Sequence, residues 1–181
     1  MGYNGFRRIS VTLKGATYMN GKYALDTPYP EVRGTCTHSD LRILMDLYCG
    51  RAGELTAITQ YLYQRYLTDG IDETLSNCLM GISKTEMRHH ALLGEAIVKM
   101  GGDPIMGGST CFWSGSNLNY NQNPICFLQN NIAAEQQAIC NYRRAAACIN
   151  NVSLSELLLR IAQDEELHIE IFNELLEGLN C

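Results

Sequence analysis

The 181-residue sequence lacks several features that would place it in common functional classes. It has no run of about twenty apolar residues, which a membrane-spanning helix requires, and no apolar signal segment near its start. Its 14 lysine and arginine residues are outnumbered by 19 aspartate and glutamate residues, whereas nucleic acids and anionic membranes are bound through clustered basic side chains. We therefore expect a cytoplasmic protein with no nucleic-acid partner and no membrane partner.

No two of the eight cysteines form a Cys-x-x-Cys pair. Rubredoxin-type iron centres and zinc ribbons need such pairs, so the sequence excludes both. Most of the cysteines are expected to be small buried residues on helices. The alternative is cross-linking between subunits, for which Cys111 and Cys181 are the candidates.

Four long segments repeat apolar residues with the 3.6-residue period of an α-helix. A short connection joins the first segment to the second and the third to the fourth, whereas the Gly-, Ser- and Asn-rich residues 101–123 separate the two pairs. This connectivity is that of an all-α, ferritin-like four-helix bundle with one long crossover, which we place in residues 39–181. The predicted helices are 40–69, 72–100, 124–149 and 153–178, the last beginning with a capping box at Ser153-Leu-Ser-Glu156.

The residues ahead of the bundle have a different pattern. Ile9, Val11 and Leu13 alternate with polar residues, as on a half-buried strand, and Asn20–Gly21 is typical of a hairpin turn. We therefore predict an extended, β-hairpin arm over residues 1–38. An isolated hairpin is marginally stable in water, so the arm is expected to pack on its own bundle or on a neighbouring subunit.

The chain has four histidines, and two of them follow a glutamate by three positions near the middle of a predicted helix. Each of the other two helices carries a glutamate near its own midpoint. Midpoints of antiparallel helices of similar length lie at one level of a bundle, so these side chains are expected to meet. The six residues are Glu54, Glu86, His89, Glu135, Glu165 and His168.

The four glutamates interrupt apolar helix faces, where a carboxylate without a partner would cost several kcal/mol. Two divalent cations would balance the four carboxylates, and the imidazoles would add neutral ligands. A single Glu-x-x-His pair is usually a solvated helix face, but two such pairs with partner glutamates match the dinuclear carboxylate pattern. We therefore predict two Fe or Mn ions per chain. The other histidines, His38 and His90, fit no ligand pattern and are expected to be structural or exposed.

Three further residues could support the ligands. Asp164 could accept a hydrogen bond from the distal nitrogen of His89, as metal-bound histidines usually require; the alternative is a solvated carboxylate. Tyr61 and Tyr142 lie two turns from predicted ligands and could contact them; the alternative is that both are ordinary core tyrosines.

These motifs resemble those of the ferritin-like dimetal-carboxylate superfamily over about residues 39–178, in two of its branches. The segments EMRH and DEELH are similar to bacterioferritin, a resemblance that implies the same six ligands and a haem bound by Met87 across a dimer axis, although packing alone would also explain this methionine. The segments GELTAITQYLYQRY and NNIAAEQQ resemble manganese catalase and its shorter spore-coat relatives.

The resemblances leave three functions open. The first is a redox enzyme that acts on hydrogen peroxide or O2 at the paired metals, in a catalase- or peroxidase-like reaction. The second is a ferroxidase or iron-handling protein of the bacterioferritin kind. The third is an assembly or spore-coat protein that retains the metal site as a structural element. In each case we expect a homo-oligomer, either a dimer or a larger array.

Overall fold

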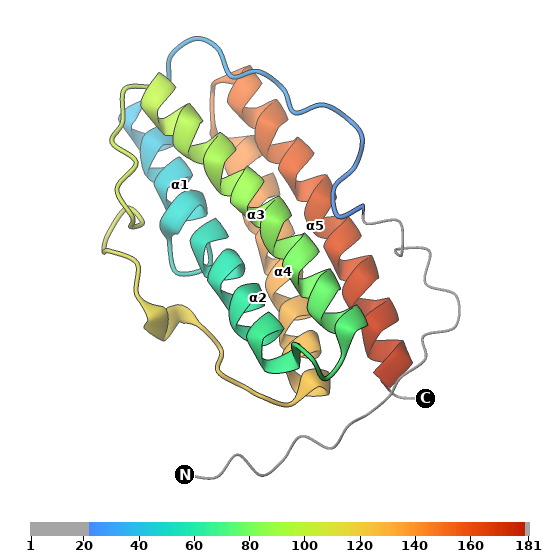
Figure 1. The fold of residues 1–181 in the computed structure, drawn as a ribbon. Helices are drawn as coiled ribbons and strands as arrows, with labels where there is room; N and C mark the ends of the chain where they lie inside the picture. The colour runs from blue at the N-terminus through green and yellow to red at the C-terminus, as the bar shows by residue number, and fades with distance from the viewer. Residues whose placement is uncertain (1–21, 180–181) are drawn as a thin grey trace.

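The computed structural model describes residues 22–179 and consists of helices and their connections (Figure 1). Within these residues no strand forms, and one isolated bridge pairs Gly107 with Phe112. None of the described helices is long and apolar enough to cross a membrane. The elements are α1 (His38–Cys49), α2 (Glu54–Thr68), α3 (Glu73–Lys99), the short 3₁₀ helix η2 (Gly115–Asn117), α4 (Pro124–Cys148) and α5 (Val152–Leu179).

The helices form a four-helix bundle in which α1 and α2 follow one another along α3, and α4 pairs with α5 (Figure 1). A short turn closes each pair, and residues 100–123 cross from the end of α3 to the start of α4. At that start the Asn123 side chain accepts a hydrogen bond from the Cys126 amide, and Pro124 occupies the first turn. The predicted all-α, four-helix architecture with one long crossover is confirmed.

The prediction of one continuous helix over residues 40–69 is wrong, because the helix is interrupted at residues 50–53. Gly50 is extended, and a β-carbon there would lie 2.3 Å from the Asp46 carbonyl oxygen. A β-carbon at Gly53 would lie 2.4 Å from the Leu47 carbonyl oxygen, so the tight turn needs both glycines. As a result Glu54 lies in the first turn of α2, where the helix dipole favours a negative charge.

The start of α5 also differs from the prediction. The Asn151 side chain, and not that of Ser153, caps the helix by accepting a hydrogen bond of 3.0 Å from the Leu154 amide. The Ser153 hydroxyl is engaged elsewhere, since it accepts a hydrogen bond of 2.8 Å from the Arg33 amide. Ser153 therefore ties the N-terminal residues to the bundle.

The predicted strand at Ile9–Leu13 and the Asn20–Gly21 turn lie outside the described residues. The described part of the arm, residues 22–37, is extended and runs along the face of the bundle formed by α3 and α5 (Figure 1). We call residues 22–33 the strap. Its backbone and side chains contact both helices, so this part of the arm packs on its own bundle.

The apolar core is divided into two clusters. One lies in the half of the bundle that contains α1 and includes Leu44, Leu93 and Leu158; the other lies towards the opposite end and includes Leu79 and Phe172. On α3 and α5 the predicted ligands fall between the residues of the two clusters. Apolar packing therefore isolates the middle level of the bundle from both ends.

The expectation that most cysteines are buried is wrong for the described residues. Cys49 and Cys78 are buried and Cys36 is partly buried, whereas the remaining four are exposed. Three of these four lie on α4, at positions that no other described helix covers. The exposed cysteines are Cys111, Cys126, Cys140 and Cys148.

Candidate metal centre

The structure brings all six predicted ligand residues together in the interior of the bundle. One comes from α2, two from α3, one from α4 and two from α5, and every one of them is buried. Their potential ligand atoms form two overlapping groups, each with all atoms within 4.8 Å of one another. The groups are Glu54, Glu86, His89 and Glu165, and Glu86, Glu135, Glu165 and His168.

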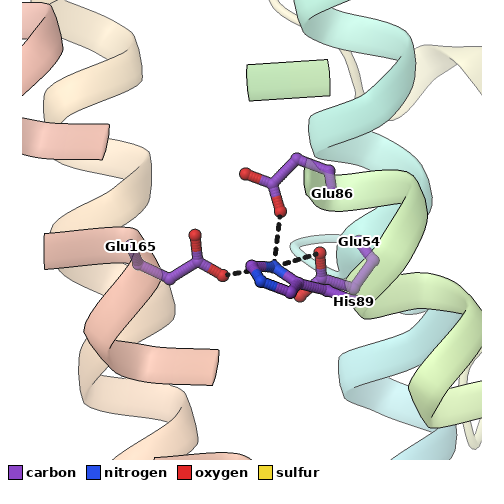
Figure 2. Close-up of side chains that lie close together, drawn as sticks. All are labelled: Glu54, Glu86, His89 and Glu165. Atoms are coloured by element: carbon purple, nitrogen blue, oxygen red, sulfur yellow. Dashed lines mark hydrogen bonds and ion pairs between the residues drawn. The ribbon is translucent and has the colours of Figure 1, made fainter. Parts of the chain in front are cut away.

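In the first group the carboxylates surround one nitrogen of His89 (Figure 2). The His89 Nδ1 atom lies 3.1 Å from Glu86 Oε2, 3.2 Å from Glu165 Oε1 and 3.7 Å from Glu54 Oε2. Glu165 reaches this nitrogen from α5, on the opposite side of the bundle interior from Glu54 and Glu86 (Figure 2). Three carboxylates from three helices thus converge on one imidazole.

The second group has the same arrangement around His168. The His168 Nδ1 atom lies 3.0 Å from Glu86 Oε1, 2.9 Å from Glu165 Oε2 and 3.7 Å from Glu135 Oε1. Each of Glu86 and Glu165 therefore directs one oxygen towards each histidine. The two groups share these two carboxylates.

The outer nitrogens of both histidines have partners that face away from the carboxylates. The His168 Nε2 atom lies 2.9 Å from the Tyr23 carbonyl oxygen, and the His89 Nε2 atom lies 3.1 Å from Asp164 Oδ2. A carbonyl oxygen only accepts hydrogen bonds, so the His168 Nε2 atom carries a hydrogen. In the neutral ring the Nδ1 lone pair then points at carboxylate oxygens, an arrangement that requires a cation or an added proton between them.

The donor set fits two divalent cations. Among the described residues, Glu54 Oε2, Glu86 Oε1, Glu165 Oε2 and His168 Nδ1 are buried and make no directed hydrogen bond, although they lie close to one another. Buried polar atoms are normally paired, and ligand atoms aimed at a common ion are the exception. Carboxylate and imidazole ligands suit Mn and Fe.

Without a cation, protons must offset the negative charge. Burial and then the neighbouring carboxylates, Glu165 and Glu86, raise the pKa of Glu135 to about 8. The same two causes raise the pKa of Glu54 well above its ordinary value. Burial alone would lower the pKa of His89 and His168, but the surrounding carboxylates raise both well above the ordinary range.

The two predicted tyrosines each donate a hydrogen bond to a cluster carboxylate. The Tyr61 hydroxyl donates to Glu135 Oε1, and the Tyr142 hydroxyl donates to Glu54 Oε1. Burial and the adjacent carboxylates raise the pKa of both tyrosines well above the ordinary value, so both stay protonated. Tyr61 and Tyr142 thus position Glu135 and Glu54, the two glutamates that are not shared between the ligand groups.

The structure places Asp164 against His89, and residues that the sequence analysis missed fix this carboxylate. Its Oδ2 atom accepts a hydrogen bond of 2.6 Å from the Tyr29 hydroxyl, and its Oδ1 atom accepts one of 2.8 Å from the Leu25 amide. Arg160 Nη1 lies 2.8 Å from Oδ1. Burial opposes ionisation, but the hydrogen bonds from His89, Tyr29 and Leu25 lower the pKa of Asp164 to about 2.

A sequence signal for part of this arrangement was present. Arg160 lies four residues before Asp164 on an otherwise apolar face of α5, and a buried arginine needs a partner. Tyr23 and Leu25 act through backbone atoms, for which no residue type is diagnostic. Met87 lies apart from the cluster, with 41% of its surface exposed on α3.

A cavity of about 490 Å³ opens to the cluster on the side of α2 and α4, away from the strap. Its inner end includes the four glutamates with Tyr61 and Tyr142. Its outer walls include Arg51 at the break between α1 and α2, Ala134 and Ala138 on α4, and Asn119 of the crossover. The centre is thus reached from one face of the bundle and covered on the other by the strap.

Comparisons with known proteins agree with this fold. Residues 51–181 match the family model of the ferritin-like domain. Protein CotJC of Bacillus subtilis (strain 168) is 25% identical over an alignment 179 positions long, which spans 87% of this chain and 93% of that protein.

Two solved structures represent the structural neighbours. KatB, a manganese catalase from Anabaena, superposes with a TM-score of 0.78 at 22% identity, over 86% of this chain and 80% of KatB. The bacterioferritin BfrA of Mycobacterium tuberculosis superposes with a TM-score of 0.67 at 24% identity, over 81% of this chain and 89% of BfrA.

Proposed function

We propose that this chain, which belongs to the ferritin-like domain family, is a redox protein that decomposes hydrogen peroxide at two Mn or Fe ions. The observation that carries the proposal is the pair of overlapping four-residue groups, which share Glu86 and Glu165. Both groups are buried, and the four carboxylates match the charge of two divalent ions.

The residues divide between the two ions according to the groups. Glu54 and His89 would hold one ion, Glu135 and His168 the other, and Glu86 and Glu165 would contribute to both. Two bound ions would supply the two-electron exchange with both oxygens of a peroxide. O2 is the other small substrate that suits such a centre.

Residues of the chain itself control how a substrate reaches the ions, keep bulk water away and hold protons nearby. The cavity between α2 and α4 admits a small molecule as far as the four glutamates, and the two apolar clusters keep bulk water from the ends of the bundle. The Tyr61 and Tyr142 hydroxyls hold protons at Glu135 and Glu54, on the cavity side of the centre. Both protons are therefore close to where the substrate oxygens arrive.

The structural neighbours support two versions of the proposal. The fit to KatB, a manganese catalase, favours manganese and peroxide. The fit to a bacterioferritin, together with the exposed Met87 that could bind haem beside a second subunit, favours iron and a ferroxidase reaction. A homo-oligomer, and an assembly or coat role as a third function, are supported by the four exposed cysteines.

Metal analysis of the full chain, purified without added metal or chelator, tests the proposal first. We expect about two Mn per chain and rapid O2 release from added peroxide. About two Fe with fast oxidation of added ferrous ion would select the ferroxidase version. A chain that binds neither ion after reconstitution would contradict the dinuclear centre.

Neighbouring residues of α5 provide a matched pair of variants. Glu165 belongs to both ligand groups, whereas Glu166 is exposed and forms an ion pair with Arg143. We expect Glu165→Gln to lose both metals and all peroxide activity, and Glu166→Gln to keep both. Equal metal contents in the two variants would show that the assigned ligands are wrong.

A further inference from the structure

A second cluster of potential ligand atoms lies outside the metal centre, where the end of α1, α3 and the crossover meet. The Cys49 Sγ atom lies 3.4 Å from His90 Nε2 and 3.7 Å from Met106 Sδ. Cys49 is buried, His90 is half-buried, and Met106 has 53% of its surface exposed. We call Cys49, His90 and Met106 the sulfur cluster.

Neighbouring contacts hold this cluster in place. The Tyr48 ring stacks on the His90 ring, with the centroids 4.0 Å apart and the planes at 25°. The Tyr48 hydroxyl lies 3.4 Å from the Pro104 carbonyl oxygen and 3.6 Å from Met106 Sδ. The following turn is fixed to α1, because the Ser109 amide and hydroxyl donate to Asp46 at 2.6 and 2.9 Å.

The hydrogen bonds available within the cluster are weak. The Cys49 sulfur, itself a weak donor and acceptor, faces Met106 Sδ and His90 Nε2, and the latter donates or accepts according to the tautomer of the ring. A thioether accepts hydrogen bonds only weakly. One cation among the three atoms would engage all of them.

We propose that the sulfur cluster binds one monovalent, thiophilic cation, Cu(I), for which Ag(I) is a redox-inactive substitute. Thiolate and thioether ligands select Cu(I) over the harder ions that suit carboxylates. The charges also match, because one thiolate neutralises one monovalent cation, and imidazole and thioether are neutral. Among residues 22–179, sets of three His, Cys, Asp or Glu ligands occur only at the metal centre, so the sulfur cluster lacks the hard ligands that other ions need.

Binding is an exchange of a proton for the metal ion. Burial raises the pKa of Cys49 to about 12, so the sulfur carries a hydrogen when no metal is bound. The S–H bond breaks, an S–Cu bond forms, and the proton passes to the solvent, with no change of oxidation state. The exposed Met106 provides the entry point, since it lies on the crossover at the molecular surface.

The test uses the full chain in an anaerobic titration with Cu(I) against the chelator bicinchoninate. The exposed cysteines 111, 126, 140 and 148 are first replaced by serine, because their thiols would also bind copper. We expect one tightly bound Cu(I) per chain. Since altering residues around a metal site typically costs about 10- to 100-fold in affinity, Met106→Leu should weaken binding at least about tenfold.

Met80→Leu is the matched control, because it removes a partly buried methionine of α3 that lies ten residues, or about 15 Å along the helix, from His90. It should bind Cu(I) as tightly as the parent. X-ray absorption at the copper edge should show one nitrogen and two sulfur neighbours in the parent, and one sulfur fewer in Met106→Leu.

The proposal is overturned if no tight site exists, or if Met106→Leu retains the parent affinity and both sulfur neighbours. Cys49→Ser should abolish the tight site; a tight site that survives this change would belong to other thiols. Mn or Fe content should be the same in the parent and in Met106→Leu, so failure of the copper site and failure of the dinuclear centre are distinguishable.

Discussion

At the residue scale, the metal centre depends on the orientation of two imidazole rings. Each ring directs Nδ1 towards three carboxylates and Nε2 towards an acceptor outside the cluster. For His89 that acceptor is Asp164, which Tyr29 and Leu25 of the strap hold in place. Such outer contacts fix the ring and the tautomer of a metal-bound histidine.

We predict that Tyr29→Phe weakens metal binding while the fold is kept. The variant removes the 2.6 Å hydrogen bond to Asp164 Oδ2, which should cost about 1 kcal/mol of stability and about tenfold in metal affinity. The measurements are thermal unfolding of the metal-free chain and chelator competition for Mn.

Tyr63→Phe is the control, because the Tyr63 hydroxyl bonds to the Tyr120 carbonyl oxygen at an exposed position away from the centre. It should leave the metal affinity unchanged. If the two variants lowered the affinity equally, the Tyr29 hydroxyl would have no specific role in positioning His89.

The convergence of the six predicted ligands was predictable because a glutamate on an apolar helix face needs a partner, and the helical period shows which face that is. The contacts of Tyr23 and Leu25 were not predictable. They are made by backbone atoms of an extended segment, where neither side-chain type nor period indicates which residue meets a histidine.

At the element scale, the strap closes the face of the bundle between α3 and α5. The Tyr23 carbonyl oxygen accepts hydrogen bonds from His168 Nε2 and from the Thr85 hydroxyl, and Arg160 donates to the carbonyl oxygens of Thr27 and Leu25. The strap thus joins both helices that carry the histidines.

We predict that Gly81→Ala displaces the strap and weakens the centre without touching a ligand. A β-carbon at Gly81 would lie 2.1 Å from the Tyr23 ring, so Tyr23 would have to move. Elsewhere in a helix this substitution stabilises by about 1 kcal/mol. We expect it here to increase proteolysis of the strap and to lower metal affinity.

Gly94→Ala on the same helix is the comparison, because its β-carbon would meet only the edge of Tyr48, at 3.2 Å. The strap should remain protected in that variant. If the strap resisted proteolysis equally in both variants, the Tyr23 ring could move without displacing the rest of the strap.

The break between α1 and α2 shows why element boundaries were harder to predict than element types. The interruption spans residues 50–53, close to one helical turn of 3.6 residues. The apolar period therefore continues in phase across it, and the two helices have the pattern of one. The long helices were predictable from their apolar period, and the crossover from its glycine-rich composition.

At the scale of the whole molecule, the buried charge links the fold to protons and metal. Glu54, Glu135, His89 and His168 have a raised pKa in the metal-free fold. The metal-free folded chain therefore binds protons that the unfolded chain releases as pH rises. Glu86 and Asp164 have a lowered pKa, so at acid pH they make the folded chain bind fewer protons than the unfolded chain. For Glu86, burial opposes ionisation, but the charge of His168 stabilises the carboxylate.

These shifts predict that the metal-free protein loses stability as pH rises. Stability falls with pH wherever the folded state binds more protons, by about 1.4 kcal/mol per pH unit for each proton. The stability that Glu135 contributes to the metal-free fold is fully present below its ordinary pKa of 4.5 and is lost as pH rises to about 8. The contribution of the histidines is lost above their ordinary value of 6.5. Asp164 adds a loss below 3.8, so stability should be greatest in mildly acidic solution.

The metal-loaded protein should have the opposite slope over the same range. Bound ions keep the ligands deprotonated in the fold, whereas the unfolded chain still takes up protons below about pH 6.5. Its stability should therefore rise with pH up to that value and then level off. Urea unfolding from pH 5 to 8, with and without Mn, measures both slopes. Glu135→Gln should flatten the metal-free slope by about one proton between pH 5 and 8. Parallel slopes in the two forms would mean that the cluster does not exchange protons for metal.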